Sequence, residues 1–178
     1  MSTGVDNDRE AGRFQVLGSG TCTMPALNIR RAIPSEAKVL SRLAKVAKAT
    51  WGYSPAQLQV WKADLTVTPA QIEDNDAYVA ESGGRIIAFY ILSGDPPELA
   101  IDHFWVEPTR MRRGVGASLL SHALARGSER GAESIAIDAD PYAEAFYVAR
   151  GARRVGMVAA PINGEPDRVR PQLKLKVD

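Results

Sequence analysis

The chain has one cysteine, Cys22, among its 178 residues, and it has no long apolar run. A single cysteine excludes an intrachain disulfide, which suits a reducing compartment. A membrane-spanning helix needs about 20 consecutive apolar residues, and no segment of the sequence reaches that length. Residues 1–23 are polar and contain no apolar stretch of the kind found in signal peptides. We therefore expect a cytoplasmic protein that does not act in a membrane.

A net charge of one sign is also missing. The 22 basic and 21 acidic residues give a formal net charge of +1. Proteins that hold nucleic acid by its phosphates usually carry a clustered positive excess, so we expect no nucleic acid partner. A nucleic-acid-binding domain remains a disfavoured alternative, because six arginines could contact phosphates. They are Arg110, Arg112, Arg113, Arg150, Arg153 and Arg154.

Metal ligands and paired nucleophiles are scarce as well. The sequence has two histidines, and no His, Cys, Asp or Glu cluster has the spacing of a metal site, so we expect no metal. The cysteine has no partner pattern that would activate it, so we expect no acyl-enzyme intermediate. His122 falls on the polar face of an expected helix, where we expect it to be solvated.

The composition that is present is that of one folded domain. Hydrophobic residues make up 45% of the chain and charged residues 24%. Residues 1–25 are rich in small polar residues and lack periodicity, so we expect a flexible extension, with Met24 as an alternative start. The folded domain is expected over residues 26–178.

The first half of this domain predicts alternating types of element. Residues 27–32 alternate as in a short strand, and a helix opens at Ser35. Its apolar positions are Val39, Leu40, Leu43, Val46 and Ala47. Residues 54–57 and 68–71 each combine a hydroxyl, a proline and a glutamine as in a capping box, which predicts two short helices. Residues 78–80, 86–92 and 99–106 are rich in β-formers and predict three strands.

The second half predicts two strand–helix units and a final hairpin. A helix over 115–130 ends at Gly131, and a strand covers 134–138. Asp140 caps a helix that runs to Arg150, and strands cover 153–159 and 169–177. If the two short helices are counted as one irregular segment, the order is β-α-α-β-β-β-α-β-α-β-β. This order predicts an α+β fold with a mixed, mostly antiparallel sheet of six to seven strands flanked by helices.

The most informative stretch is residues 106–120. A strand ends at Val106, a basic turn follows, and Gly114 and Gly116 open a long helix. Glycines let backbone N–H groups approach a ligand, and a helix N-terminus adds partial positive charge, so this arrangement can hold a diphosphate. A Gly-x-Gly pair at a helix start is by itself equally typical of a tight, closely packed turn.

Residues 111–116 resemble the Gln/Arg-x-x-Gly-x-Gly/Ala signature of the GNAT superfamily of N-acetyltransferases. They differ at the first position, where Met111 replaces Gln or Arg, a position that contributes mostly through its backbone. The resemblance implies that backbone amides of this turn bind the pyrophosphate of coenzyme A. The residues concerned are Arg112, Arg113, Gly114, Val115, Gly116 and Ala117.

Residues 140–152 resemble a second family segment, Asn-x-x-Ala-x-x-Phe/Leu-Tyr-x-x-x-Gly. Ala145 and Tyr147 are assigned by this resemblance to cofactor binding and catalysis, whereas Tyr142 stands where the asparagine is expected. In many members the tyrosine protonates the departing CoA thiolate. A phenol with a pKa of about 10 suits this role beside a thiol with a pKa of about 8.5. From the residues alone, core aromatics of an amphipathic helix are the favoured interpretation of Phe146 and Tyr147, and the first motif reverses this preference.

The resemblance extends over residues 27–178. It assigns 99–106 to the strand that diverges from the next parallel strand, where backbone near Phe104, Trp105 and Val106 would hold the pantetheine arm and polarise the acetyl carbonyl. The implied activity is that of an acetyl-CoA-dependent N-acyltransferase (EC 2.3.1.-). Acetyl-CoA would be the co-substrate, and a small-molecule or peptide primary amine would accept the acetyl group directly in a ternary complex. A homodimer is an open option.

Direct transfer also needs a base that takes a proton from the acceptor ammonium. The candidates near the expected reaction centre are Glu98, Asp102 and His103. Alternation along a strand places Asp102 and His103 on opposite faces. His103 could instead be a hydrogen-bonded structural residue, and Asp102 could pair with an arginine. Tyr53 is expected to line the acceptor pocket.

A catalytically silent acyl-CoA-binding module is the main functional alternative. Such a module would share the glycine turn but would need neither Tyr147 nor a base.

Overall fold

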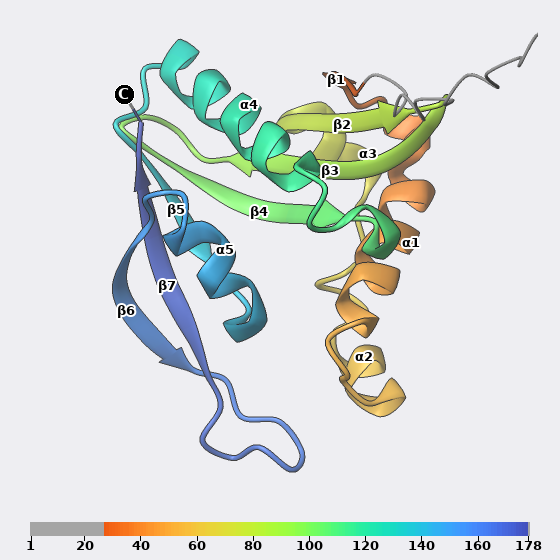
Figure 1. Cartoon of the computed structure of the whole chain (residues 1–178), viewed down its shortest axis with the longest axis vertical. Helices are drawn as coiled ribbons and strands as arrows, with labels where there is room; N and C mark the ends of the chain where they lie inside the picture. Colours follow the sequence, from red (N-terminus) through yellow and green to blue (C-terminus); the bar gives the residue numbers. More distant parts are fainter. Residues whose placement is uncertain (1–26, 178) are drawn as a thin grey trace, which may run out of the picture.

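The computed structural model describes residues 27–177, so the expected N-terminal extension, Met24 and Cys22 lie outside the described residues. Seven strands form one sheet in the order β1-β2-β3-β4-β5-β7-β6 (Figure 1). The strands are β1 (Asn28–Arg31), β2 (Asp76–Ser82), β3 (Arg85–Ser93), β4 (Glu98–Val106), β5 (Ser134–Asp138), β6 (Arg153–Ala159) and β7 (Val169–Lys176). The helices are α1 (Ala37–Ala49), α2 (Pro55–Val60), α3 (Pro69–Asp74), α4 (Val115–Glu129) and α5 (Glu144–Val148). Short 3-10 turns precede α1, α4 and α5 as η1 (Pro34–Glu36), η2 (Pro108–Arg110) and η3 (Pro141–Ala143).

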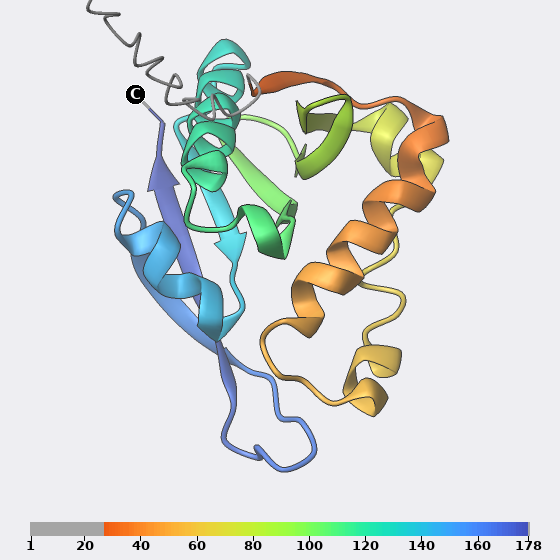
Figure 2. The same cartoon turned by 45° about the vertical axis from the view of Figure 1, so that its right-hand side comes forward.

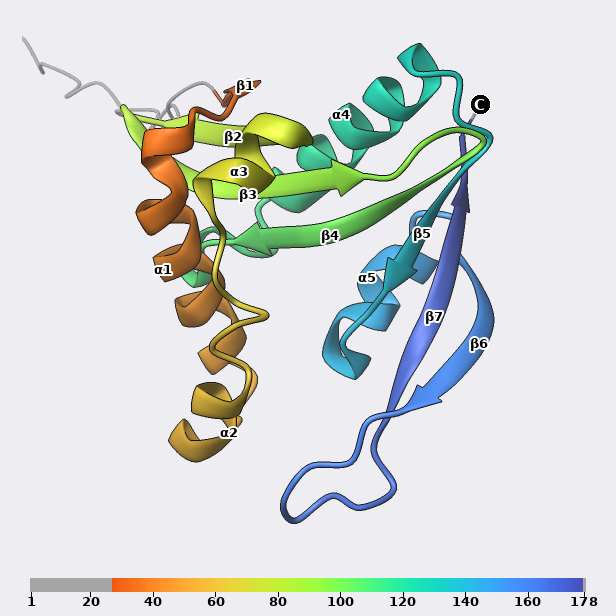
Figure 3. The ribbon, with the colours of Figure 1, turned by 180° about the vertical axis from the view of Figure 1, so that it is seen from behind.

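The predicted fold class is confirmed, because the sheet is mixed and mostly antiparallel. Only β4 and β5 pair in parallel, from Glu98↔Ser134 to Ile101↔Ile137. Beyond Ile101, β4 continues to Val106 without β5, so the sheet splits there. Figure 3 shows the two strands diverging from the end that lies near the C-terminus.

A β-bulge lies at this split. Ile91 pairs with His103 and Leu92 pairs with Ile101, so Asp102 has no partner residue on β3. A bulge breaks the alternation of side chains and redirects one of them. As a result Ile101 and Phe104 both contact the core under α4, while Asp102 is exposed at the split.

Helices cover both faces of the sheet. The side chains of Leu119 and Leu120 on α4 pack with Leu99 and Ile135 of the sheet. On the other face, α1 and α3 pack over β2 and β3. Figure 2 shows α1 apart from α4 and α5, on the other side of the sheet. None of the helices in this part of the chain is long and apolar enough to cross a membrane.

Most of the apolar stripe predicted for α1 is buried, but Val39 and Val46 are exposed. The buried face is completed instead by small residues, Ala37, Ser41 and Ala44. Val39 lies about 100° round the helix from Leu40, which turns it out of the stripe.

The helix starts follow the predicted capping chemistry. The Thr68 hydroxyl accepts the Gln71 N–H, and the Gln71 side chain accepts the Thr68 N–H in return. The Ser54 hydroxyl accepts the Gln57 N–H without the reciprocal bond. Asp140 caps the last predicted helix as expected, although its first turn is 3-10 and α5 itself ends at Val148.

The prediction that His122 is solvated is wrong, because its side chain is half-buried. Its Nδ1 lies 2.8 Å from the hydroxyl of Tyr90, and its ring centroid lies 4.7 Å from that of Tyr78. Both tyrosines lie on the strands beneath α4, and their aromatic surface extends to the edge of the helix. This lateral packing is a tertiary contact that helical periodicity does not reveal.

Candidate active site

Two cavities meet where β4 leaves β5. The first, which we call the α4 cavity, has a volume of about 430 Å³ and lies at the N-terminus of α4. The second, the β4–β5 cavity, has a volume of about 270 Å³ and lies between the split strands and the end of α1. Five residues line both cavities, namely Trp51, Phe104, Trp105, Ala143 and Tyr147. The two cavities therefore adjoin along these five residues.

The turn before α4 leaves its backbone amides free. Arg112 and Gly114 both have a positive φ, of 58° and 83°, and no side chain caps the helix. In residues 27–177, no backbone or side-chain acceptor takes a hydrogen bond from the N–H groups of residues 112–117. The first bond of the helix runs from the Ser118 N–H to the Gly114 carbonyl. Free N–H groups at a helix N-terminus are suited to an anion such as a diphosphate.

The two glycines of this turn have different tasks. A Cβ on Gly114 would meet no atom within 4 Å, so its left-handed backbone, and not crowding, favours glycine. A Cβ on Gly116 would lie 3.1 Å from Cε2 of Phe146, so glycine there allows α5 to approach α4 closely. The residues present therefore fit an anionic group at the turn.

The remainder of the α4 cavity is largely apolar. Phe104, Val106, Met111 and Phe146 line it, and the Arg150 guanidinium lies 3.9 Å from the Phe146 ring centroid. This lining suits a long ligand with an anionic end and an apolar arm.

Seven of the residues predicted to bind the cofactor line this cavity. They are Phe104, Trp105, Val106, Arg112, Gly114, Gly116 and Ala117. Val115 is buried beneath the helix, and Arg113 and Ala145 are exposed outside the lining.

Tyr147 is buried at the junction of the two cavities. Its ring packs against Phe104 and Phe146, with centroid distances of 5.9 and 5.0 Å. Burial raises the pKa of the Tyr147 hydroxyl well above its usual value, so the phenol stays protonated at neutral pH. Among residues 27–177 the hydroxyl has no hydrogen-bond partner, which leaves it available to a ligand.

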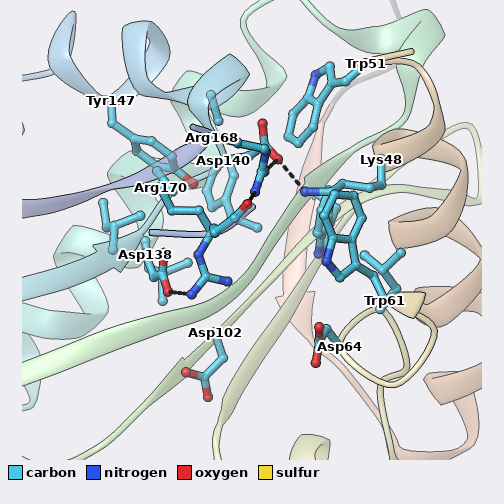
Figure 4. A pocket seen from close by; sticks show the side chains of 18 of the residues that line it. Lys48, Trp51, Trp61, Asp64, Asp102, Asp138, Asp140, Tyr147, Arg168 and Arg170 are labelled. Carbon is cyan, nitrogen blue, oxygen red and sulfur yellow. Dashed lines mark hydrogen bonds and ion pairs between the residues drawn. The ribbon is translucent and has the colours of Figure 1, made fainter. Parts of the chain in front are cut away.

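A charged cluster forms one wall of the β4–β5 cavity (Figure 4). Asp140 Oδ2 lies 2.5 Å from Lys48 Nζ and 3.0 Å from a guanidinium nitrogen of Arg168. The Tyr53 hydroxyl donates to the same carboxylate oxygen at 2.8 Å. Burial lowers the pKa of Lys48, although the hydrogen bond to Asp140 opposes this effect. We call Lys48, Asp140 and Arg168 the Asp140 cluster.

Aromatic rings surround the ammonium of this cluster. Lys48 Nζ lies 5.0 Å from the Trp51 ring centroid and 4.6 Å from that of Trp61, which are cation–π distances. Tyr53, the predicted acceptor-binding residue, packs edge-on against Trp61 at 4.8 Å and is buried behind the wall. It holds the Asp140 cluster and does not line the cavity itself.

Three further carboxylates line the cavity, and two of them are unpaired. Asp138 forms an ion pair with Arg170 at 2.8 Å. By contrast, neither Asp64 nor Asp102 has a hydrogen bond or an ion pair within residues 27–177. In Figure 4 both lie below the Asp140 cluster.

The two candidate bases have different surroundings. Asp102 is exposed and lines the cavity, whereas His103 is buried on the face toward α1. The Trp105 indole N–H donates to His103 Nδ1 at 3.2 Å. Burial lowers the pKa of His103, opposed by the charges of Asp102 and Asp64, so the imidazole is neutral at neutral pH.

Sequence reasoning missed most of the charged wall. Asp140 was visible as a helix cap, but its partners Lys48 and Arg168 lie 92 and 28 residues away in the chain. No local pattern marks a pair at such separations. Trp61, Asp64 and Arg170 likewise belong to a helix end, a loop and the strand β7, which only the fold brings together. No group of three or more potential metal-ligating side chains occurs within the described residues.

Comparisons with known proteins agree with this geometry. The acetyltransferase (GNAT) family matches residues 41–152. The structure is similar to the GCN5-related N-acetyltransferase from Rhodopseudomonas palustris, with a TM-score of 0.70 and 22% identity over 88% of this chain and 99% of that chain.

Two similar structures contain the cofactor. The PaiA N-acetyltransferase from Thermoplasma acidophilum, in complex with coenzyme A, has a TM-score of 0.66 and 13% identity over 85% of this chain and 99% of that one. A GNAT family acetyltransferase from Brucella melitensis, in complex with acetyl-CoA, has a TM-score of 0.59 and 17% identity over 86% and 89%. A search of curated protein sequences found no match. Because the family match covers more than half of the sequence, the chain belongs to the acetyltransferase (GNAT) family.

Proposed function

We propose that this protein transfers the acetyl group of acetyl-CoA directly to a primary amine in a ternary complex. The observation that carries the proposal is the junction at Tyr147. There, a cavity with free backbone amides meets a cavity with unpaired carboxylates. Members of the GNAT family generally catalyse reactions of class EC 2.3.1.-, and two structurally similar acetyltransferases contain CoA or acetyl-CoA.

The proposed cofactor contacts follow the shape of the α4 cavity. The amides of residues 112–117 would hold the pyrophosphate, and the apolar lining would hold the pantetheine arm. Between residues 102 and 106, β4 has no strand partner on its β5 side, so backbone groups there are available to the thioester. A hydrogen bond from this backbone would stabilise the negative charge that develops on the acetyl oxygen.

In the chemical step the acetyl group moves from sulfur to nitrogen, and a proton moves in net terms from nitrogen to sulfur. The amine nitrogen attacks the thioester carbon, the carbon–sulfur bond breaks, and the Tyr147 hydroxyl gives its proton to the departing thiolate. The nitrogen then loses its surplus proton through water, which returns a proton to the Tyr147 oxygen and leaves a neutral amide. Support for this role comes from the raised pKa of Tyr147, which keeps the proton in place until it is needed.

We propose Asp102 as the group that receives the acceptor ammonium and accepts its proton, directly or through water. Its support is that Asp102 is exposed in the β4–β5 cavity and unpaired within residues 27–177. His103 is the alternative base. It is neutral and lies next to Asp102, but Trp105 occupies its Nδ1, so only Nε2 remains for the transfer.

Release of the CoA thiol tests the proposal. Acetyl-CoA is incubated with a panel of primary amines that includes amino acids, polyamines and peptide N-termini, and free thiol is measured against acetyl-CoA alone. An amine-dependent rate well above the rate with acetyl-CoA alone is the expected result. Tight binding of acetyl-CoA with no turnover of any amine would favour the silent module instead.

Homodimer formation is a separate proposal. β6 is an edge strand, and Val155, Met157 and Val158 are exposed on it. Light scattering coupled to size-exclusion chromatography should give twice the mass of 19.2 kDa. A mass equal to one chain at micromolar concentration would rule out the dimer under those conditions.

A further inference from the structure

The positive and negative charges that line the β4–β5 cavity are not balanced within each local group of side chains. In the Asp140 cluster, the two cations Lys48 and Arg168 share one carboxylate, which leaves one positive charge in excess. These side chains are strongly buried, with exposed fractions of 11% for Lys48, 4% for Arg168 and 5% for Asp140. A buried excess charge is unfavourable unless an opposite charge compensates it.

Lys48 is the member of the cluster that can still bind a ligand. An ammonium has three N–H donors, and in residues 27–177 Asp140 is the hydrogen-bond acceptor for Lys48 Nζ. Arg168 already donates to the Ala160 carbonyl, the Tyr53 hydroxyl and Asp140. Within residues 27–177 the other two N–H donors of Lys48 face aromatic rings and have no oxygen acceptor, and Lys48 lines the cavity.

Elsewhere in the lining of the cavity, negative charge is in excess. Asp64 and Asp102 have no ion pair within the described chain, while Asp138 and Arg170 neutralise each other. In Figure 4 both side chains lie below Lys48, with Asp64 beneath Trp61 and Asp102 below Arg170. An acceptor ammonium would be held there, beside the proposed base.

One small molecule satisfies both sides if it carries an ammonium and a single negative charge. A phosphate monoester carries about two negative charges at neutral pH, which exceeds the single positive charge of the Asp140 cluster. A carboxylate matches that charge. The cavity volume of about 270 Å³ lies just below the range of about 300–1,000 Å³ typical of ligand pockets, which favours a small acceptor.

We infer that the acceptor is a small aminocarboxylate, whose carboxylate binds Lys48 and whose ammonium binds Asp102 and Asp64. This inference rests on the proposed acetyl transfer and specifies its substrate class. In the reaction, the ammonium loses a proton to Asp102, and the nitrogen–carbon bond forms as the carbon–sulfur bond of the thioester breaks and Tyr147 protonates the thiolate. The carboxylate stays bound and takes no part in the chemistry.

Matched acceptors test the inference. The value of kcat/KM is measured by CoA thiol release for alanine, phenylalanine and lysine, and for their amides and their decarboxylated amines. The amides keep the size of each amino acid and remove the negative charge. At least one aminocarboxylate should exceed both of its partners by about tenfold or more, the size expected for one charged hydrogen bond.

The variant Lys48→Met tests the assigned site. For each protein, the preference is the kcat/KM value for an aminocarboxylate divided by the value for its amide or its decarboxylated amine. Comparing this ratio between variant and wild type removes the intrinsic difference in amine reactivity. The preference for the carboxylate should fall by about ten- to hundredfold in Lys48→Met and persist in Lys48→Arg. Lys45→Met is the matched control, since Lys45 is exposed on the same helix and should leave the preference unchanged. All three variants should keep the thermal shift caused by acetyl-CoA, which shows that they fold.

Several results would overturn the inference. They are equal kcat/KM within the matched sets, turnover confined to amines without a carboxylate, and a carboxylate preference that survives Lys48→Met. In each case acetyl transfer itself would stand. No turnover of any aminocarboxylate by a protein that binds acetyl-CoA would also overturn the inference. Absence of both acetyl-CoA binding and turnover would instead contradict the proposed function.

Discussion

Replacing Tyr147 with phenylalanine removes one oxygen atom from the junction of the two cavities. The ring contacts with Phe104 and Phe146 remain, and the lost hydroxyl has no hydrogen-bond partner among residues 27–177. Removing an unpaired polar group costs little, so the free energy of unfolding should change by less than about 1 kcal/mol. Loss of a general acid should lower kcat by about 100- to 10,000-fold.

The assay for Tyr147→Phe is CoA thiol release at saturating acetyl-CoA and amine, together with the thermal shift caused by acetyl-CoA. Turnover should fall while the shift is kept, because Tyr147 donates its proton only as the thiolate leaves. Tyr78→Phe is the control, since Tyr78 is a half-buried tyrosine on β2 outside both cavities. Unchanged turnover in Tyr147→Phe would refute the assignment of the proton donor.

Three further predictions concern Asp102, the two histidines and the Asp140 cluster. Asp102→Asn should lower kcat/KM by about 100-fold or more and change its pH profile, whereas a profile like that of the wild type would favour His103 as the base. Burial lowers the pKa of both His103 and His122 below the value of about 6.5 in the unfolded chain. Near and below that pH the unfolded chain binds more protons than the folded chain does, so the free energy of unfolding should fall from pH 7.5 to pH 5.5. Urea unfolding measures this fall, which should be smaller in a variant with both histidines replaced by phenylalanine. Asp140→Asn leaves two buried cations without their carboxylate and should lower the free energy of unfolding by about 3–5 kcal/mol, while a loss below 1 kcal/mol would contradict the ion-pair account.

The elements that could be predicted from the sequence are those specified by neighbouring residues. The capping box at Thr68 and Gln71 and the glycines before α4 act over three or four positions, and the structure has helices starting where they predict. The strand predicted over 134–138 has the bounds of β5. The order of these elements, with one crossover between parallel strands, then restricted the sheet to a mixed and mostly antiparallel one.

The features that could not be predicted depend on contacts between residues that are far apart in the sequence. The bulge at Asp102 arises from the register between β3 and β4, and it determines which side chain points into the split. The charge excess of the Asp140 cluster needs α1, the β5–α5 loop and the segment before β7 to converge. The prediction that His122 is solvated is wrong because the tyrosines that pack against it lie on strands far from α4 in the sequence.

Thermal unfolding with and without acetyl-CoA tests the central claim most directly. A ligand at 100 times its Kd that binds only the folded state stabilises it by about 2.7 kcal/mol, which is roughly 5–10 °C for a domain of this size. We expect such a shift in the wild type and in Gly131→Asp, and its loss in Gly114→Asp. Both glycines have a φ near +80° with no atom within 4 Å of a Cβ, but only Gly114 lies at the N-terminus of α4. No shift in the wild type at millimolar acetyl-CoA would contradict the account, because the free amides before α4 would then not hold the cofactor.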